Sequence, residues 1–446
     1  MLRRFLSMLQ IDQHIAFSLI LRIWSIFAGG LIVLIIPYTL TKVQQGFYFT
    51  FSSLLAAQIF FELGLNTVIA QIVGHEMAFL KFNKENNLEG SPEHLSRIHS
   101  LFKLIRRFYA VISVLFFLVA LAGGYIFFSR QPVDNGREWI YVWPLLTFFT
   151  SIILFSSPFL AALEGMGLVS RISKLRLLQS MVGYTFLFLS LFMQFGLKSM
   201  IAIPAAAASF TSIWLWIKYK NLFFSEFNGT SVSRISWRRE IFPFQWRIAL
   251  SWLSGYFIYQ LFNPVIFSNF GAEAAGQVGL ALTVFATIGA LSFSWVNAKA
   301  PVMTNLIATG KTAELNALFK SLILRSAALN VLCCAGFIVV IEIIKLFGFF
   351  LADRLPGLEI LLLLAIVCFS NHLIFSVATF MRAHKKEPML ANSIFTAMLS
   401  VVGLYVGAKI SVFYMILVYA VIILVVSLPW ALYLFQKFYK LGPQKN

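Results

Sequence analysis

Twelve apolar runs, each about long enough to cross a bilayer, dominate this sequence of 446 residues. A helix needs about 20 apolar residues to cross ~30 Å of hydrocarbon. Backbone polar groups find no water there, so runs of this length are helices. The runs lie at approximately 16–40, 46–73, 106–128, 139–164, 177–197, 199–217, 242–268, 275–303, 325–350, 357–381, 388–408 and 412–436. We therefore predict an all-α membrane protein with about twelve transmembrane helices.

The charged residues indicate how these helices cross the membrane. Only 12% of the residues are charged, and the net charge is +18. Most of the 35 Lys and Arg fall in alternate connections, on the side shared by both termini. Such a bias marks the cytoplasmic side, so we expect both termini in the cytoplasm. The basic charge therefore reports topology, and we expect no nucleic-acid partner.

The connections between runs predict the domain organisation. A long basic connection near mid-chain separates six runs from six, which predicts an N-terminal lobe at 1–219, a cytoplasmic linker at 220–240 and a C-terminal lobe at 241–446. The longest loop on the outer side has about ten residues, around SRQPVDNGRE. This loop is too short for an external active site, and Cys and His show no metal-ligand spacing. We expect no enzymatic activity, cofactor or metal.

Two arginines lie inside apolar runs at matching places in the two halves. Arg22 lies in the first run and Arg247 in the seventh, each about five residues from the cytoplasmic end. Ser25 shares a helix face with Arg22, and Ser251 and Ser254 share one with Arg247. An ionisable residue inside a membrane span is a functional candidate. We predict that both arginines line a cavity, with capping of carbonyls or contact with headgroups as the alternative.

The eighth run carries a second polar stripe. Thr283 and Thr287 share one face, and Lys299 lies near the end of the run. Hydroxyl side chains are routine in tight helix packing, but next to the arginine of the seventh run they indicate a cavity wall. Lys299 either binds anions in this cavity or extends its side chain to the membrane surface.

The second run carries Gln58, Glu62 and Asn66 at four-residue spacing. This spacing places them on one helix face, which either lines a cavity or makes a polar contact with a neighbouring helix. We predict that Glu62 couples or gates transport. Desolvation favours its protonated form and nearby cations favour its ionised form, so proton coupling and an ionic latch both remain open.

His372 lies in the middle of the tenth run. Histidine changes its charge near physiological pH, so His372 is a second candidate for coupling. A neutral histidine packed between helices is the alternative.

Three stretches of the sequence resemble polysaccharide flippases of the Wzx type. They are QWRIALSWLSGYFIYQLFNPVIFSNFGAEAAGQVGLALTV with the following SFSWVNAKAP, the segment 40–76 that contains QQGFYFTFSSLLAAQIFFELGLNTVIAQ, and MRAHKKEP. The resemblance extends over essentially the whole chain. It implies the superfamily that also holds multidrug and toxin extruders and lipid II flippases. In this superfamily two six-helix lobes face a central cavity, which the first, second, seventh and eighth helices line.

The resemblance also implies a function. A flippase of this type moves undecaprenyl-diphosphate-linked oligosaccharide outward across the bacterial inner membrane, for O-antigen, capsule or exopolysaccharide synthesis. The lipid-linked oligosaccharide and membrane lipid would be its partners, together with a polysaccharide polymerase and a chain-length regulator, and the chain would act as a monomer. Arg22, Arg247 and Lys299 would then bind the diphosphate, because arginine is a bidentate phosphate ligand. A multidrug or cation antiporter of the same fold is the alternative.

Overall fold

The computed structural model describes the whole chain except residues 1–12, 84–86, 131–137, 225–232, 385–387 and 442–446. The cytoplasmic placement of the two ends and of the middle of the 220–240 linker therefore falls largely outside the described residues. Within the described residues, ten helices are long and apolar enough to cross a membrane, or eleven if one bent pair counts as a span. The remaining difference from twelve arises because Gln245–Ala308 forms one continuous apolar stretch, where the sequence predicted two spans.

The described residues are mostly helical. In chain order, the α-helices are α2 (Gln13–Thr39), α3 (Lys42–Leu55), α4 (Ile59–Glu62), α5 (Leu65–Glu76), α6 (Pro92–Ser129), α7 (Trp139–Gly165), α8 (Val169–Phe192), α9 (Ala202–Phe224), α10 (Phe242–Tyr259), α11 (Phe262–Ala298), α12 (Ala300–Ala308), α13 (Thr312–Leu346), α14 (Leu358–Ala383), α15 (Leu390–Gly407), α16 (Val412–Val421) and α17 (Leu428–Leu441). Short 3-10 segments are η1 (Ala56–Gln58), η2 (Met77–Phe79), η3 (Gly196–Ile201) and η5 (Phe350–Arg354), and π-helical segments are η4 (Trp237–Ile241) and η6 (Ile422–Ser427). Strands β1 (Leu80–Phe82) and β2 (Leu88–Gly90) pair antiparallel.

The chain packs as two compact units. Unit 1 comprises residues 1–28 and 54–253, and unit 2 comprises residues 29–53 and 254–446. Helices α2 and α10 each contribute residues to both units. The lobe boundaries expected from the sequence remain a prediction.

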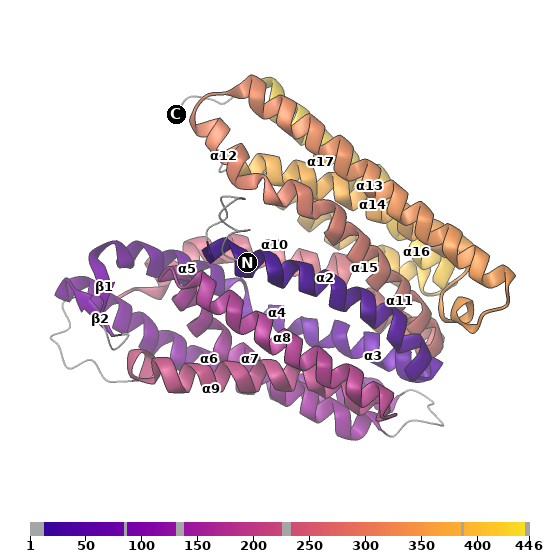
Figure 1. Cartoon of the computed structure of the whole chain (residues 1–446), viewed down its shortest axis with the longest axis horizontal. Helices are drawn as coiled ribbons and strands as arrows, with labels where there is room; N and C mark the ends of the chain where they lie inside the picture. Colours follow the sequence, from indigo (N-terminus) through magenta and orange to yellow (C-terminus); the bar gives the residue numbers. More distant parts are fainter. Residues whose placement is uncertain (1–12, 84–86, 131–137, 225–232, 385–387, 442–446) are drawn as a thin grey trace. The chain divides into compact units, whose positions relative to one another are not determined.

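Helix α7 is the central helix of unit 1. It packs against α5, α6 and α9, and α8 packs against α9 (Figure 1). In the most apolar 18-residue stretch of α7, 56% of the residues are buried. Large apolar side chains such as Phe102, Phe159 and Tyr219 fill the core of the unit.

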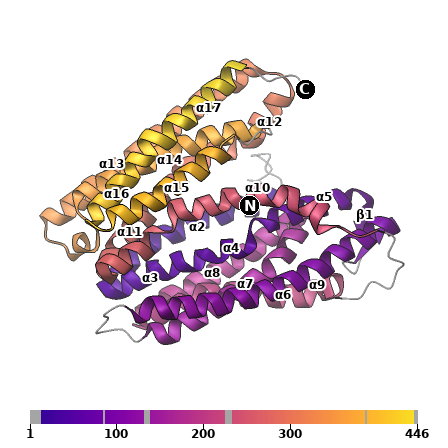
Figure 2. The same ribbon diagram turned by 180° about the vertical axis from the view of Figure 1, so that it is seen from behind.

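Helix α14 has the corresponding place in unit 2. It packs against α11, α13, α16 and α17 (Figure 2). In its most apolar 18-residue stretch, 56% of the residues are buried as well. Both α7 and α14 belong to the fourth apolar run of their half of the sequence.

The second predicted span is broken, whereas the sequence predicted a continuous helix. Leu63 and Gly64 have φ of 49° and 67°, and the helices on either side are bent by 46°. A Cβ atom on Gly64 would lie 2.4 Å from Cγ2 of Ile248. Glycine is required here because it adopts positive φ without strain and lets α10 approach closely.

The connection between the predicted runs 242–268 and 275–303 lies inside one helix, α11, rather than in a loop. Within α11 only Gly271 leaves helical geometry, with φ of 86° and ψ of 175°. Helix α3 crosses this connection closely, since a Cβ atom on Gly46 would lie 1.9 Å from the carbonyl oxygen of Ala272. The residues on either side of Gly271 are therefore helical, and the helix kinks at this glycine.

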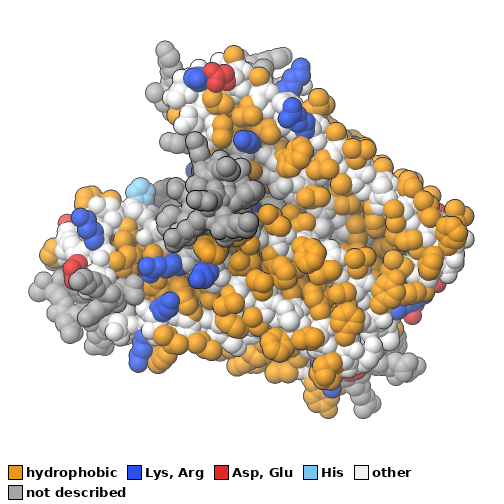
Figure 3. Space-filling model, in the orientation of Figure 1, with side chains coloured by type: hydrophobic (Ala, Val, Ile, Leu, Met, Phe, Trp, Pro, Cys, Tyr) orange, Lys and Arg blue, Asp and Glu red, His pale blue; other side chains and the backbone are white. Residues whose placement is uncertain are grey.

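The outer surface of the helices is apolar. In the most apolar 18-residue stretch of α13, only 17% of the residues are buried. The side chains of Leu324, Leu332 and Leu346 are 69%, 70% and 86% exposed. Figure 3 shows hydrophobic side chains over most of the visible face of the helices, while over unit 1 most Lys and Arg gather toward the end at the left of the view. Apolar surface of this extent is stable against lipid rather than water. The expected multi-pass membrane fold is confirmed.

Candidate functional site

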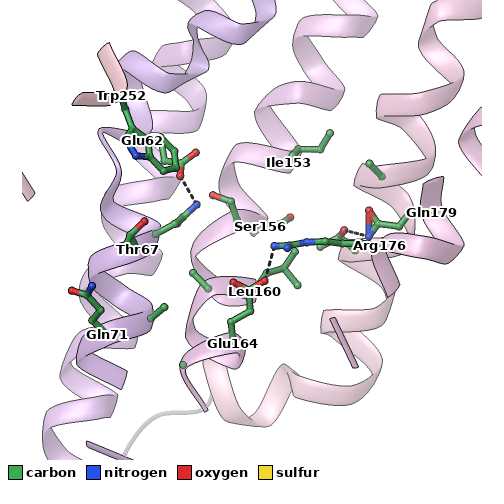
Figure 4. Close-up of a pocket in the computed structure, with 17 residues that line it drawn as sticks. Glu62, Thr67, Gln71, Ile153, Ser156, Leu160, Glu164, Arg176, Gln179 and Trp252 are labelled. Atoms are coloured by element: carbon green, nitrogen blue, oxygen red, sulfur yellow. Dashed lines mark hydrogen bonds and ion pairs between the residues drawn. The ribbon is translucent and has the colours of Figure 1, made fainter. Parts of the chain in front are cut away.

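Unit 1 contains a cavity of about 760 Å³. Helices α5, α7, α8 and α9 form its walls, together with Glu62 of α4 and Trp252 of α10 (Figure 4). Small residues leave the space open, because Ala70, Ala161 and Ala207 line it from three different helices. Its uncharged polar lining comprises Asn66, Thr67, Gln71, Ser156, Ser157, Gln179 and Thr211.

The helix break of the second span positions Glu62 and Asn66 at this cavity. Glu62 is the last residue of α4, and Asn66 lies in the first turn of α5. The Asn66 amide donates to Oε1 of Glu62 over 2.8 Å, and the Tyr109 hydroxyl donates to Oδ1 of Asn66 over 3.1 Å. Tyr109 thus fixes the orientation of the Asn66 amide toward the carboxylate. The sequence predicted Glu62 and Asn66 as site residues. It did not predict Tyr109, because an aromatic residue in a span rich in aromatic residues carries no signal of its own.

A second polar group of the cavity was also missed. Arg176 of α8 pairs with Glu164 of α7, with 2.8 Å between Nη2 and Oε1 (Figure 4). Nearby, Gln179 donates to the Thr211 hydroxyl over 3.0 Å. In the sequence, Arg176 is one of the many Lys and Arg that indicate the topology, and its place at a cavity was not predicted. The polar spacing of Arg176 and Gln179 on one helix was the available signal.

The charges of the cavity lining oppose those of the whole chain. The lining contains two carboxylates, Glu62 and Glu164, and one guanidinium, Arg176. Since the ion pair cancels two of these charges, an ionised Glu62 leaves the lining net negative. The chain as a whole carries +18. Such a cavity does not attract a diphosphate.

The three cations expected to bind anions are exposed and lie outside this cavity. Arg22 and Arg247 belong to unit 1, and Lys299 follows α11 in unit 2. Among the described residues none of the three forms an ion pair, and the Arg247 guanidinium lies 5.4 Å from the ring centre of Trp246. Their anion-binding role remains a prediction.

Most of the predicted hydroxyl residues are bonded within their own helices. Ser25 donates to the carbonyl of Leu21, Thr283 to that of Gly279 and Thr287 to that of Thr283. Such bonds leave only acceptor capacity for a ligand.

The remaining predicted polar residues differ in burial. Ser254 is buried in unit 2, whereas Ser251 is half-buried in unit 1. Gln58 lies in η1 of unit 1, and its Oε1 atom is buried without a hydrogen-bond partner among the described residues. A cavity role for these three residues remains a prediction.

His372 lies in a buried polar network inside unit 2. It is 2% exposed, and its Nε2 lies 3.0 Å from the hydroxyl of Ser326 on α13. Close by, the amide of Asn330 donates to Ser292 over 3.4 Å and to the sulfur of Cys368 over 3.5 Å. This placement favours the packed histidine over the coupling histidine, although a coupling role remains a prediction.

An ionic cluster joins the end of the 220–240 linker to unit 1. Glu76 contacts His94 over 2.6 Å and Arg97 over 2.8 Å, and Arg97 also contacts Glu240 over 2.5 Å. Partial burial disfavours the ionised Glu240, but the Ser236 amide and Arg97 outweigh it and hold the pKa of Glu240 below its ordinary value. The cluster holds η4 against α6.

The sequence matches no protein-family model and no curated protein sequence. The fold, in contrast, is similar to several solved structures. The lipid II flippase MurJ in an inward closed conformation has a TM-score of 0.62 and 11% identity, over 95% of this chain and 87% of that one. An inward-facing multidrug resistance MATE family transporter of the MOP superfamily has a TM-score of 0.58 and 13% identity, over 92% of this chain and 99% of that one. A MATE structure in the straight conformation has a TM-score of 0.52 and 15% identity, over 96% of each chain.

These likenesses show that the chain has the helical membrane fold shared by MurJ and the MATE transporters, as the sequence predicted. The identities are low, so the likeness concerns the fold. The assignment to the Wzx type remains a prediction.

Proposed function

We propose that the protein is a flippase that moves an undecaprenyl-diphosphate-linked oligosaccharide across the bacterial inner membrane by alternating access. The observation that carries this proposal is the fold shared with a lipid II flippase. The resemblance of the sequence to Wzx-type flippases specifies the lipid-linked oligosaccharide. A polysaccharide polymerase and a chain-length regulator would act on the exported product.

The exposed arginines supply the anion chemistry that such a substrate needs. A diphosphate cannot cross hydrocarbon without partners for its charge. Arg22 and Arg247 are both exposed in unit 1, and neither is neutralised by an ion pair among the described residues. A guanidinium binds phosphate through two parallel N–H donors. Arg22 and Arg247 would therefore bind the diphosphate, with Lys299 as a further cation.

Transport by reconstituted protein tests this proposal. The full chain in proteoliposomes should translocate a fluorescent polyprenyl diphosphate that carries an oligosaccharide. Arg22→Ala/Arg247→Ala should abolish this movement, and Arg247→Lys should restore it only in part because a point charge lacks the bidentate fork.

The matched control is Arg130→Ala, which removes an exposed arginine after the end of α6. It should transport at the wild-type rate. Wild-type transport by the double arginine variant at normal protein level would refute the diphosphate site.

A multidrug or cation antiporter is the second candidate, favoured by the net negative lining of the cavity and by the likeness to MATE transporters. It predicts that proteoliposomes export a lipophilic cation and leave the lipid diphosphate where it is.

A further inference from the structure

The cavity of unit 1 has the size of a ligand site but the wrong charge for a phosphate. Its volume of about 760 Å³ falls within the range of roughly 300–1,000 Å³ typical of small-molecule sites. The lining is net negative with Glu62 ionised and neutral with Glu62 protonated, so in neither state does it attract the diphosphate of the proposed substrate, which must bind elsewhere. Resting on the proposed function, we infer that the cavity is a saccharide subsite, which binds one neutral sugar of the lipid-linked headgroup.

The lining offers the hydrogen-bonding groups that sugar hydroxyls need. A hydroxyl donates one hydrogen bond and accepts others. Gln71 and Thr67 present an amide and a hydroxyl, and no hydrogen bond within the described residues occupies either side chain. Glu62 accepts one bond from Asn66, and a carboxylate has about four acceptor positions. A site with this many hydrogen-bonding groups selects a ligand that satisfies them.

Trp252 supplies the apolar wall of the subsite. It is 37% exposed and lines the cavity together with Glu62. The indole combines a broad apolar ring with one polar N–H, which suits the C–H face of a sugar ring. Arg247 lies five residues earlier in α10, about 7.5 Å along the helix axis. The two residues also lie about 140° apart around the helix, so the sugar and the diphosphate would contact different faces of α10.

The alternative occupant is a lipophilic cation. An ionised Glu62 would attract it, since the ion pair of Arg176 with Glu164 is neutral as a whole. Amides and hydroxyls outnumber the charges, and a lipophilic cation leaves such groups unsatisfied. The lining therefore favours a neutral polyol.

Two lipid probes separate this inference from the proposed function. The first is polyprenyl diphosphate alone, and the second is a panel of the same lipid bearing glucose, galactose or N-acetylglucosamine. Affinities for the purified full chain are measured in nanodiscs. At least one sugar-bearing lipid should bind more tightly than the bare lipid. Trp252→Ala and Glu62→Gln should weaken it about tenfold, toward the affinity of the bare diphosphate.

Control variants assign the effect to the cavity. Trp216→Ala removes a tryptophan on α9 that is 57% exposed and outside the cavity lining, and it should change neither affinity. Gln71→Ala truncates an exposed side chain of the lining and keeps the test valid if Trp252→Ala fails to fold. Arg22→Ala/Arg247→Ala should weaken both kinds of lipid.

Each remaining outcome overturns at least one of the two ideas. Equal affinity for bare and sugar-bearing lipids, both dependent on the arginines, would refute the saccharide subsite and leave the proposed function intact. Binding of neither lipid would refute both. Binding of tetraphenylphosphonium that Glu62→Gln abolishes would replace the sugar with a cation.

Discussion

Helices α7 and α14 are similar in length and burial, yet their polar residues have different surroundings. In unit 1, Ser156 and Ser157 of α7 line an open cavity, because alanines on the neighbouring helices leave space. In unit 2, His372 and Cys368 of α14 contact polar side chains of α13, which occupy the corresponding space. The polar residues of a membrane helix therefore mark a ligand site only where the opposing side chains are small.

The largest expected effect tests whether the network of unit 2 is dry. Asn330 is 0% exposed, so Asn330→Asp buries a charge without a compensating partner. We expect a loss of about 3–5 kcal/mol in the free energy of unfolding, seen as a lower thermal midpoint of the purified protein. Asn305→Asp, at an exposed position of α12, should stay within about 0.5 kcal/mol of wild type. A wild-type midpoint for Asn330→Asp would mean that water enters unit 2.

A matched pair of overpacking substitutions compares the two units directly. Ser292 is 0% exposed, and Ser292→Leu should cost about 1–3 kcal/mol of stability. Ser157→Leu fills part of the cavity in unit 1, so it should leave stability nearly unchanged and reduce transport severalfold. Thermal midpoints and proteoliposome rates measure the two effects. Equal losses of stability would remove the distinction between the units.

Glu62→Gln tests the function of the cavity rather than its packing. The amide keeps the shape of the side chain and loses its charge, so we expect transport to fall about tenfold, equivalent to ~1.4 kcal/mol. Collapse of the proton gradient should stop wild-type transport only if Glu62 carries the coupled proton. Wild-type rates in the variant would make Glu62 a structural contact, like the polar residues of unit 2.

The smallest effect belongs to the partly buried ionic cluster of Glu76, His94, Arg97 and Glu240, which belongs neither to the cavity of unit 1 nor to the polar network of unit 2. Because the pKa of Glu240 is lower in the folded protein than its ordinary value of about 4.3, Glu240 contributes stability above that value. This contribution is lost as the pH falls through the folded pKa. Glu240→Gln should cost roughly 0.2–1 kcal/mol at pH 7 and progressively less below pH 4.3, measured as thermal midpoints against pH. A loss that grows on acidification would contradict the sign.

The sequence by itself determined the class of this protein. Apolar runs of about 20 residues have only one stable arrangement in hydrocarbon, which is the helix, so the membrane fold follows from composition and run length. Glu62 and Asn66 could also be predicted from the sequence. Polar residues are rare in such a run, and in a helix the four-residue spacing places both side chains on one face.

Only the tertiary structure decided which polar groups share a cavity. Glu164 and Arg176 lie on different helices and meet through the packing of α7 on α8 and α9, which no local pattern encodes. His372 has the polarity and depth of a site residue, yet its Nε2 pairs with Ser326 of another helix, while its Nδ1 is buried without a partner among the described residues. Whether a polar side chain faces a cavity or a partner depends on the volume of the residues opposite it, and the pairing of helices sets which residues those are.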